Sequence, residues 1–215
     1  DLVAYNRTPD KAADLAAAGA TIAPSIADAC RGCEVVITMV ADARDVEAVL
    51  FGANGVASGA RTGLTVIDMS TIGPAAARDI GARLAVAGID FLDAPVSGGE
   101  TGAINATLTI MVGGAPAIYG RSLPLLQRMG KSVTLVGACG AGQVAKACNQ
   151  ILTGVGTVAL AEAMAFAKRS GVDPARVREA MLGGFAYSRI LENHGQRMID
   201  GNFKPGFKGW MHRKD

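Results

Sequence analysis

Short apolar segments alternate with alanine-rich helical patterns along the first 137 residues. The continuous β-branched run Glu34–Val40 predicts a strand covered on both faces, and Leu64–Met69 predicts a second strand. Helical patterns follow each of them, at Ala43–Leu50 and Pro74–Ala87. This alternation favours an α/β fold with a Rossmann-like, doubly wound and mostly parallel sheet.

The remaining elements of this part follow the same alternation. Thr8 is expected to cap a helix that has Pro9 in its first turn and that ends at Gly19. The other expected strands are Leu2–Tyr5, Ile89–Leu92, Thr107–Val112 and Ser132–Leu135, and the other expected helices are Pro9–Ala18, Ser25–Arg31 and Pro116–Met129.

The pattern changes near Ala138, after which no strand is predicted. Gln143 to Ser170 forms one long helical stretch, and further helices are expected from Pro174 to Leu182 and from Ser188 to Met198. We therefore expect a dinucleotide-binding domain at residues 1–137 and an all-helical domain at residues 138–215. The apolar part of the long helix, Ile151–Ala167, is interrupted by Glu162, and we interpret it as too short and mixed to span a membrane but suited to a subunit interface.

Both ends of the sequence fall inside patterns of secondary structure. The first residue is Asp1, directly before a strand pattern, and the chain ends on a basic segment at Asp215. We expect the sequence to be part of a longer protein. Without the first strand of the sheet, we expect the 215-residue chain to be marginally stable and to bind a cofactor poorly.

Composition and charge exclude several classes of function. The net charge of +2 gives no electrostatic footprint for nucleic acid or for a membrane surface. The 28 glycines are scattered at turns, which excludes collagen-like and low-complexity chains, and no internal repeat is evident.

The cysteines and histidines point to no metal site. Cys30 and Cys33 form a single C-x-x-C motif with no second pair or histidine nearby. A redox pair is one interpretation, but two small apolar residues at a helix–strand turn are favoured. His194 and His212 are expected to be structural or surface residues. Reduced cysteines and the absence of a secretory signal in this sequence favour a cytoplasmic location.

Two segments carry candidate chemistry. Lys146, Asn149 and Gln150 share one helix face because they stand at positions i, i+3 and i+4. The segment from Asp93 to Gly99 is a strand end that breaks into a Ser-Gly-Gly loop, which offers bare backbone N–H groups. Together they suit a small carboxylate that also carries a carbonyl or hydroxyl group.

Ordinary structural roles would also explain these residues. Lys146 could extend from a helix edge into solvent, and Asn149 and Gln150 could be polar surface residues. The Ser97-Gly98-Gly99 loop could be a simple turn. Spacing alone favours the solvated lysine as the interpretation of Lys146.

Four segments together resemble the β-hydroxyacid dehydrogenase family, which includes 3-hydroxyisobutyrate dehydrogenase, tartronate semialdehyde reductase and 6-phosphogluconate dehydrogenase. They are Asp93–Gly99, Thr107–Gly114, Gly140–Gln150 and His212–Asp215, and the resemblance covers essentially the whole chain. The stretches Gly183–Met198 and Pro205–Lys208 look closest to the tartronate semialdehyde reductase branch.

The resemblance implies roles for the candidate residues. Lys146 would be the general acid/base, and Asn149 would hold the substrate hydroxyl or Lys146 itself, with Gln150 beside it. Ser97, Gly98 and Gly99 would bind the substrate carboxylate. The family's first strand and glycine-rich pyrophosphate turn, and its last helices, lie outside this sequence.

Two positions depart from the family pattern. Ala106 stands where a glycine is usual, which would slightly alter the loop near Ser97–Gly99. Gln150 stands where many relatives have asparagine.

The cofactor is expected to be NADP(H) in preference to NAD(H). Asn6, Arg7 and Thr8 follow the strand after which NAD-selective proteins place an acidic residue, and a guanidinium at Arg7 suits a 2′-phosphate. By resemblance, four further residues are cofactor positions: Val40 and Ala41 near the adenosine or ribose, Thr71 near the nicotinamide, and Lys214 as a second lysine.

The expected function is the NADP(H)-dependent interconversion of a short 3-oxo acid, such as tartronate semialdehyde, and its hydroxy acid, such as D-glycerate. The partner is then a small hydroxy or oxo acid, with no nucleic acid, membrane or metal, in a homo-oligomer. A 3-hydroxyisobutyrate dehydrogenase or another β-hydroxyacid dehydrogenase is the nearest alternative. A 6-phosphogluconate dehydrogenase is disfavoured because no sugar-phosphate cluster of Arg and Lys is evident. A non-catalytic dinucleotide-binding module is the alternative of another class.

Overall fold

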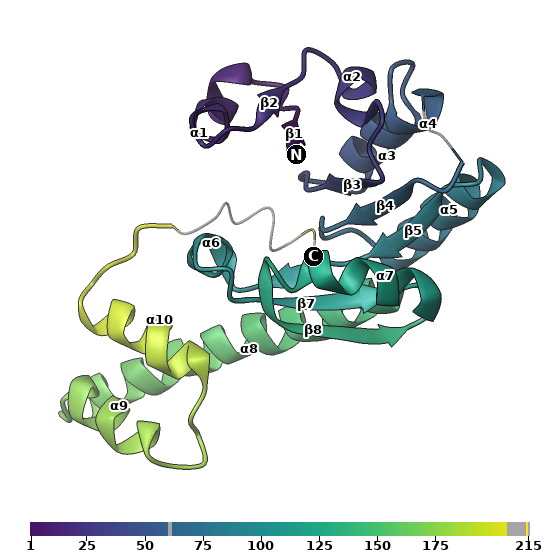
Figure 1. The fold of residues 1–215 in the computed structure, drawn as a ribbon. Coiled ribbons are helices and arrows are strands. Elements are labelled where there is room, and N and C mark those ends of the chain that lie inside the picture. Colours follow the sequence, from purple (N-terminus) through teal and green to yellow (C-terminus); the bar gives the residue numbers. More distant parts are fainter. Residues whose placement is uncertain (60–61, 206–213, 215) are drawn as a thin grey trace. The chain divides into compact units, whose positions relative to one another are not determined.

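The computed structural model describes residues 1–59, 62–205 and 214 (Figure 1). The chain divides into two compact units, Asp1–Lys146 and Ala147–Asp215. The boundary expected from the sequence, between residues 137 and 138, precedes the long helix, whereas these units divide within it. The expected boundary stays a prediction.

The first unit contains two sheets. Strand β1 (Val3–Ala4) pairs in parallel with β2 (Thr21–Ile22). In the second sheet β3 (Val35–Thr38), β4 (Thr65–Asp68) and β5 (Asp90–Asp93) are parallel neighbours. Strand β7 (Leu108–Gly113) then runs antiparallel to β5, and it pairs with the antiparallel β6 (Val96–Ser97) and the parallel β8 (Gly130–Gly137). The expected doubly wound order is confirmed, with β7 and β6 making the sheet mixed.

Helices connect these strands. The segment expected as one helix at Pro9–Ala18 is a 3₁₀ turn followed by a short α-helix, and Thr8 occupies its N-cap position without a side-chain capping bond. Gly19 ends that helix at φ +95°, as expected. The helices of this unit are η1 (Pro9–Ala12), α1 (Ala13–Ala17), α2 (Ile26–Cys30), α3 (Ala43–Phe51), α4 (Val56–Gly59), α5 (Pro74–Val86), α6 (Gly99–Ile104) and α7 (Pro116–Leu126).

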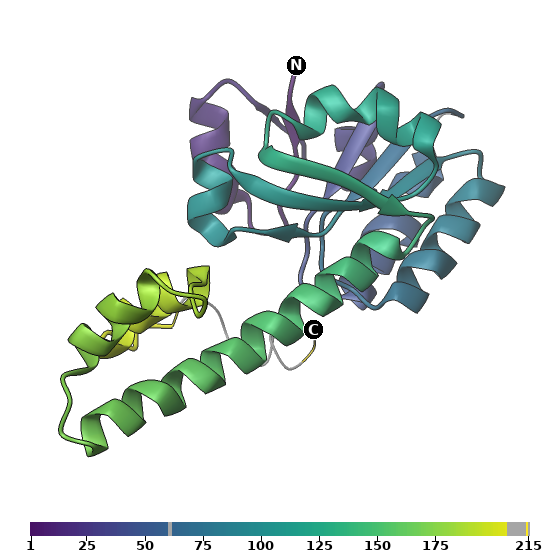
Figure 2. The same cartoon turned by 90° about the horizontal axis from the view of Figure 1, so that it is seen from below.

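Alternate residues of the central strands enter two cores, one on each face of the sheet. Val66 and Phe91 pack with residues of α3 and α5, whereas Ile67 and Leu92 pack with Leu126 of α7. This division follows from the two-residue period of a strand. Figure 2 shows α5 and α7 on opposite faces of the strands. Strand β4 is buried along its whole length, which is typical of a central parallel strand.

The expectation that Glu34–Val40 is covered on both faces is wrong for the described residues. Ile37 is 39% exposed and Met39 is 65% exposed. The physical reason is that Ile37 and Met39 alternate with Val36 and Val40, which pack against the core with α3 and α5, so the opposite face is left uncovered at Ile37 and Met39. The β-branched run does form a strand, but one edge of it has no partner strand in the described part of the chain.

The second unit is helical, as expected. Helix α8 (Ala141–Arg169) begins in the first unit and continues into this one, followed by α9 (Pro174–Leu182) and α10 (Arg189–Ile199). Asp173 caps α9 by accepting from the Ala175 N–H, and Ser188 caps α10 by accepting from the Leu191 N–H. Leu160, Met164 and Leu191 form the core of this unit.

Helix α8 is long and apolar enough, by length and composition, to cross a membrane. The expectation that this stretch is too short for a span is therefore not supported. Core helices of soluble proteins meet the same criterion, so length and composition alone do not assign α8 to a membrane.

Candidate active site

A hydrogen-bonded network joins the carboxyl ends of β3 and β4. The Thr38 hydroxyl donates to Asp68 Oδ1 (2.9 Å), which also accepts from the Ser70 N–H (3.1 Å). The Ser70 hydroxyl in turn accepts from the Val40 N–H at 2.9 Å. The expected cofactor positions Val40, Ala41 and Thr71 are half-buried and stand at or beside these strand ends. Ligands of doubly wound sheets bind at this edge.

The first turn of α8 is attached to the end of β5. Asp93 is fully buried and accepts from the Gly140 N–H at 2.7 Å through Oδ1 and from the Gln143 N–H at 2.9 Å through Oδ2. Burial raises the pKa of the Asp93 carboxyl, and the backbone N–H groups of Gly140 and Gln143 oppose that rise. The carboxylate therefore satisfies N–H groups that a helix start leaves without partners.

Gly113 and Gly142 allow the start of α8 to approach β5 and β7 closely, because neither residue has a Cβ atom. A Cβ on Gly113 would clash with Asp93 Oδ1 and would lie 2.8 Å from the Gly142 nitrogen. A Cβ on Gly142 would clash with the Met111 carbonyl oxygen and lie 2.7 Å from the Asp93 carbonyl oxygen. The helix start thus lies in direct backbone contact with β5 and β7.

A second attachment comes from the Gln143 side chain, which is 1% exposed. Its Nε2 donates to the Ser70 carbonyl at 2.8 Å, and its Oε1 accepts from the Ile72 N–H at 3.1 Å. These two bonds flank Thr71 and join the loop after β4 to α8.

Lys146 lies one turn further along α8 and is 8% exposed. The interpretation of Lys146 as a solvated lysine at a helix edge is therefore wrong. A lysine is rarely this buried unless its ammonium group has polar contacts. Asn149 and Gln150 follow on the same helix and are half-buried, and the Asn149 amide donates to Gln150 Oε1 at 3.0 Å.

The Ser97-Gly98-Gly99 segment connects the end of a strand directly to the start of a helix. Ser97 ends β6, and Gly99 begins α6. Gly98 and Gly99 have φ of +137° and +63°, which L side chains rarely adopt. Ser97 is half-buried, and both glycines are exposed.

Ala106, the departure from the family pattern, lies after α6 with φ +53°. It is the one non-glycine residue with a positive φ in the described ranges. This backbone conformation explains why glycine is usual at that position.

Asn6, Arg7 and Thr8 form an exposed turn after β1, in which Asn6 Oδ1 accepts from the Thr8 N–H at 2.9 Å. Lys214 is half-buried and helical, and it belongs to the second unit. Residues 206–213 and 215, including His212 and most of the Pro205–Lys208 and His212–Asp215 segments, lie outside the described residues.

The structure thus brings Val40, Thr71 and the start of the Lys146 helix to one edge of the sheet. Sequence reasoning assigned no role to Asp93 or Gln143, although both stand inside the quoted segments. A polar residue in the first turn of an otherwise small and apolar helix start was the signal that identifies Gln143.

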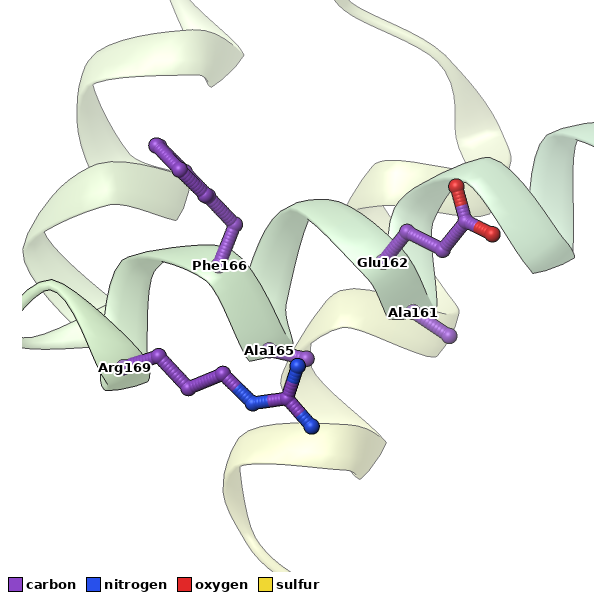
Figure 3. A pocket seen from close by; sticks show the side chains of 5 residues that line it. All are labelled: Ala161, Glu162, Ala165, Phe166 and Arg169. Atoms are coloured by element: carbon purple, nitrogen blue, oxygen red, sulfur yellow. The ribbon is translucent and has the colours of Figure 1, made fainter.

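A surface hollow lies elsewhere on α8, fifteen residues beyond Lys146 along the chain (Figure 3). Its lining residues are Ala161, Glu162, Ala165, Phe166 and Arg169. It is an open patch on one helix face and includes none of the candidate site residues, so we do not assign the chemistry to it.

The cysteine motif has the structural role favoured by the sequence. Cys30 is buried at the end of α2, and the Cys33 N–H donates to the Cys30 carbonyl in the turn before β3. Burial raises the pKa of the Cys30 thiol, with the nearby Cys33 adding to the rise, which disfavours a reactive thiolate. Among the described residues no group of three metal-ligating side chains exists.

Comparisons with known proteins identify the family of this chain. Residues 1–137 match the family model of the NAD binding domain of 6-phosphogluconate dehydrogenase, and residues 140–215 match that of the NAD-binding domain of NADP-dependent 3-hydroxyisobutyrate dehydrogenase. The chain belongs to the β-hydroxyacid dehydrogenase family.

Relatives of this family cover most of the chain. A 2-hydroxy-3-oxopropionate reductase of Escherichia coli K12 is 49% identical over 182 residues, which are 85% of this chain and 62% of that protein. The chain thus spans less than two thirds of that relative's length. The crystal structure of 3-hydroxyisobutyrate dehydrogenase from Salmonella typhimurium matches 99% of this chain and 74% of its own, at 32% identity and a TM-score of 0.86. A structure described as Psf3 in complex with NADP⁺ and 2-OPP matches 99% of this chain and 75% of its own, at 27% identity and a TM-score of 0.90.

Proposed function

We propose that the full-length protein is an NADP(H)-dependent oxidoreductase that reduces the aldehyde of a short 3-oxo acid, with Lys146 as the general acid. The observation that carries the proposal is the burial of Lys146 on a helix whose first turn is hydrogen-bonded to the strand ends. Family membership supports the reaction type.

Lys146 would supply the proton. An ammonium group can protonate the carbonyl oxygen as the carbonyl carbon is reduced, and the neutral amine can accept the hydroxyl proton in the reverse direction. Asn149 lies three residues further along α8, and its amide can both donate and accept a hydrogen bond to the substrate hydroxyl. Gln150 would support Asn149, to which it is hydrogen-bonded.

The substrate carboxylate would bind at Ser97, Gly98 and Gly99. The two positive-φ glycines leave backbone N–H groups unobstructed by side chains, and the Ser97 hydroxyl adds a donor. A substrate with a carboxylate at one end and an aldehyde close to it would be bound at both.

The residues at the strand ends fit a dinucleotide. Val40, Ala41 and Thr71 offer half-buried, mostly small surface at the edge where such sheets bind ligands. When bound, the nicotinamide of the reduced cofactor supplies the hydride. The exposed Arg7 in a turn without an acidic residue favours a 2′-phosphate, hence NADP(H) over NAD(H). Lys214 would be a second cationic cofactor contact.

Tartronate semialdehyde, reduced to D-glycerate, is the substrate we favour. It is the compound 2-hydroxy-3-oxopropionate for which the E. coli reductase is named, and that relative is 49% identical to this chain. The semialdehyde of 3-hydroxyisobutyrate is the second candidate, supported by the Salmonella structure. An assay of NADPH oxidation with both semialdehydes would rank them by kcat/KM.

The decisive experiment compares three forms of the full-length protein. Lys146→Ala should lower kcat by about 10²–10⁴-fold, the usual contribution of a general acid, with NADPH affinity preserved. Lys131→Ala removes an exposed lysine on β8 and should leave kcat unchanged. Near-normal turnover by Lys146→Ala would contradict the mechanism, and NADPH binding without turnover of any semialdehyde by the unaltered protein would favour a non-catalytic binding module.

We also propose that the full-length protein is a cytoplasmic homo-oligomer. Ile151, Leu152 and Val155 on α8 are exposed apolar side chains in this chain, which suits burial against further protein. Light scattering of the full-length protein, with Val155→Glu as the variant, tests this: a monomer in both forms would contradict it.

A further inference from the structure

We infer that Gln143 is a positioning residue that fixes the position of Lys146 relative to the loop after β4, which contains Thr71. The inference rests on the proposed function of Lys146. It concerns residues of the first unit alone, since Ser70, Thr71, Gln143 and Lys146 all lie within Asp1–Lys146.

The geometry gives Gln143 two partners on one loop. Its carboxamide donates to the Ser70 carbonyl and accepts from the Ile72 N–H, so both bonds are made to backbone groups on either side of Thr71. The side chain is 1% exposed, so these bonds have no competition from bulk water. A carboxamide can donate and accept at once at any ordinary pH, because it does not ionise.

The main chain of Gln143 is itself held against β5. The Gln143 backbone N–H donates to Asp93 Oδ2, so the same residue is bonded to β5 through its main chain and to the β4 loop through its side chain. Lys146 follows at i+3, on the neighbouring turn of the same helix face. A shift of the β4 loop relative to α8 would therefore change the spacing between Thr71 and Lys146.

The loop is also tied to β3. The Ser70 hydroxyl accepts from the Val40 N–H, so the loop that Gln143 holds connects Val40 to Thr71. Gln143 thus links the proposed cofactor positions of two strands to the helix that carries the proposed acid. Misplacement by about 1 Å is enough to reduce a rate by about 10²-fold.

The test uses the full-length protein with Gln143→Leu, Gln143→Glu and the control Tyr119→Phe. Gln143→Leu removes both side-chain bonds and should lower kcat by about 10–100-fold, while KM for NADPH changes by less than about threefold. Tyr119→Phe removes the part-buried bond from the Tyr119 hydroxyl to the Val133 carbonyl, which joins α7 to β8 and involves none of the candidate site residues, and should lower Tm without changing kcat.

Gln143→Glu supplies the readout that a purely structural role would not give. A protonated glutamic acid can donate to the Ser70 carbonyl and accept from the Ile72 N–H, whereas the ionised form can only accept. The ratio of the variant's kcat to that of the unaltered protein should therefore rise as the pH falls. The neighbouring carboxyl groups of Asp93 and Asp68 are present in both proteins, and the introduced carboxyl group is the difference that the ratio reports.

A third measurement does not depend on catalysis. Acetylation of Lys146 by acetic anhydride, followed by mass spectrometry, should be several-fold faster in Gln143→Leu and unchanged in Tyr119→Phe.

Each outcome decides the inference. It is overturned if folded Gln143→Leu keeps kcat within about threefold of the unaltered value. If Gln143→Leu does not fold, a pH-independent ratio for Gln143→Glu overturns it. If the unaltered protein reduces no semialdehyde, the proposed function fails, and the acetylation rates then decide whether Gln143 fixes Lys146.

Discussion

Asp68 and Asp93 are register partners on the neighbouring parallel strands β4 and β5, and both carboxyl groups are fully buried. They differ in their hydrogen bonds. Both oxygens of Asp93 accept from the start of α8, whereas Asp68 Oδ2 has no hydrogen-bond partner among the described residues. Burial raises the pKa of Asp68, bonds from Ser70 and Thr38 oppose the rise, and the charge of Asp93 adds to it.

The first prediction follows from this asymmetry. A carboxyl whose pKa is higher in the folded than in the unfolded state binds its proton more tightly when folded, so its contribution to stability is lost as the pH rises through the folded-state pKa. Asp68→Asn cannot ionise and keeps an oxygen for Thr38 and Ser70. It should unfold at higher urea than the unaltered chain near neutral pH, by on the order of 1 kcal/mol, and the difference should shrink as the pH approaches 4.

The control is Asp14→Asn, which removes an exposed carboxylate in the first turn of α1. It should show no comparable dependence on pH. A stability difference for Asp68→Asn that stays constant from neutral to acidic pH would contradict the account of Asp68.

The second prediction concerns the contact of α8 with the sheet. Gly142→Ala places a methyl group against the carbonyl oxygens of Met111 and Asp93, which are backbone atoms and cannot turn aside. Overpacking of this kind costs about 1–3 kcal/mol. Gly120→Ala lies in α7 with no heavy atom within 4 Å of the new methyl group, so it should stabilise by about 0.5–1 kcal/mol. Urea unfolding of the two variants should give opposite signs, and equal signs would refute the packing argument.

The third prediction concerns Ala106 at φ +53°. A left-handed conformation costs an L residue about 1–2 kcal/mol, so Ala106→Gly removes strain that offsets the extra freedom it gives the unfolded chain. Its stability should equal or exceed that of the unaltered chain. Ala103→Gly, in the exposed part of α6, should lose about 1 kcal/mol instead. Equal losses at both positions, measured by urea unfolding, would argue against strain at Ala106.

The fourth prediction concerns cofactor choice in the full-length protein. Arg7→Ala should raise KM for NADPH by about 10–100-fold, the range expected for a lost charge-assisted bond, and leave KM for NADH nearly unchanged. Arg31→Ala, which removes an exposed arginine paired with Asp28, should change neither value. Parallel losses for both cofactors in Arg7→Ala would show that Arg7 does not contact a 2′-phosphate.

The sequence predicted the order of elements because each one carries its own period. Val66 and Ile67 or Phe91 and Leu92 alternate between two cores, and that alternation is visible in the sequence. The burial of Lys146 was not visible, since spacing alone favoured a solvated lysine. It depends on the contact of Gly113 and Gly142 across residues far apart in the chain, which no local pattern encodes.

The exposure of Ile37 was missed for the opposite reason. A β-branched run predicts a strand with apolar surroundings, but it does not predict which elements cover each face of that strand. Likewise Gln143 has the same sequence signal as any polar residue in a first helical turn, and only the position of Ser70 and Ile72 gives it two partners.

The free edge of β3 has a practical consequence. Its outer backbone groups, flanked by the exposed Ile37 and Met39, have no strand partner in the described part of the chain, and such an edge is a template for intermolecular β-pairing. The soluble fraction of the isolated 215-residue polypeptide should therefore fall steeply as the total concentration rises. Aggregates that form this way should carry the β3 segment at their protease-resistant centre.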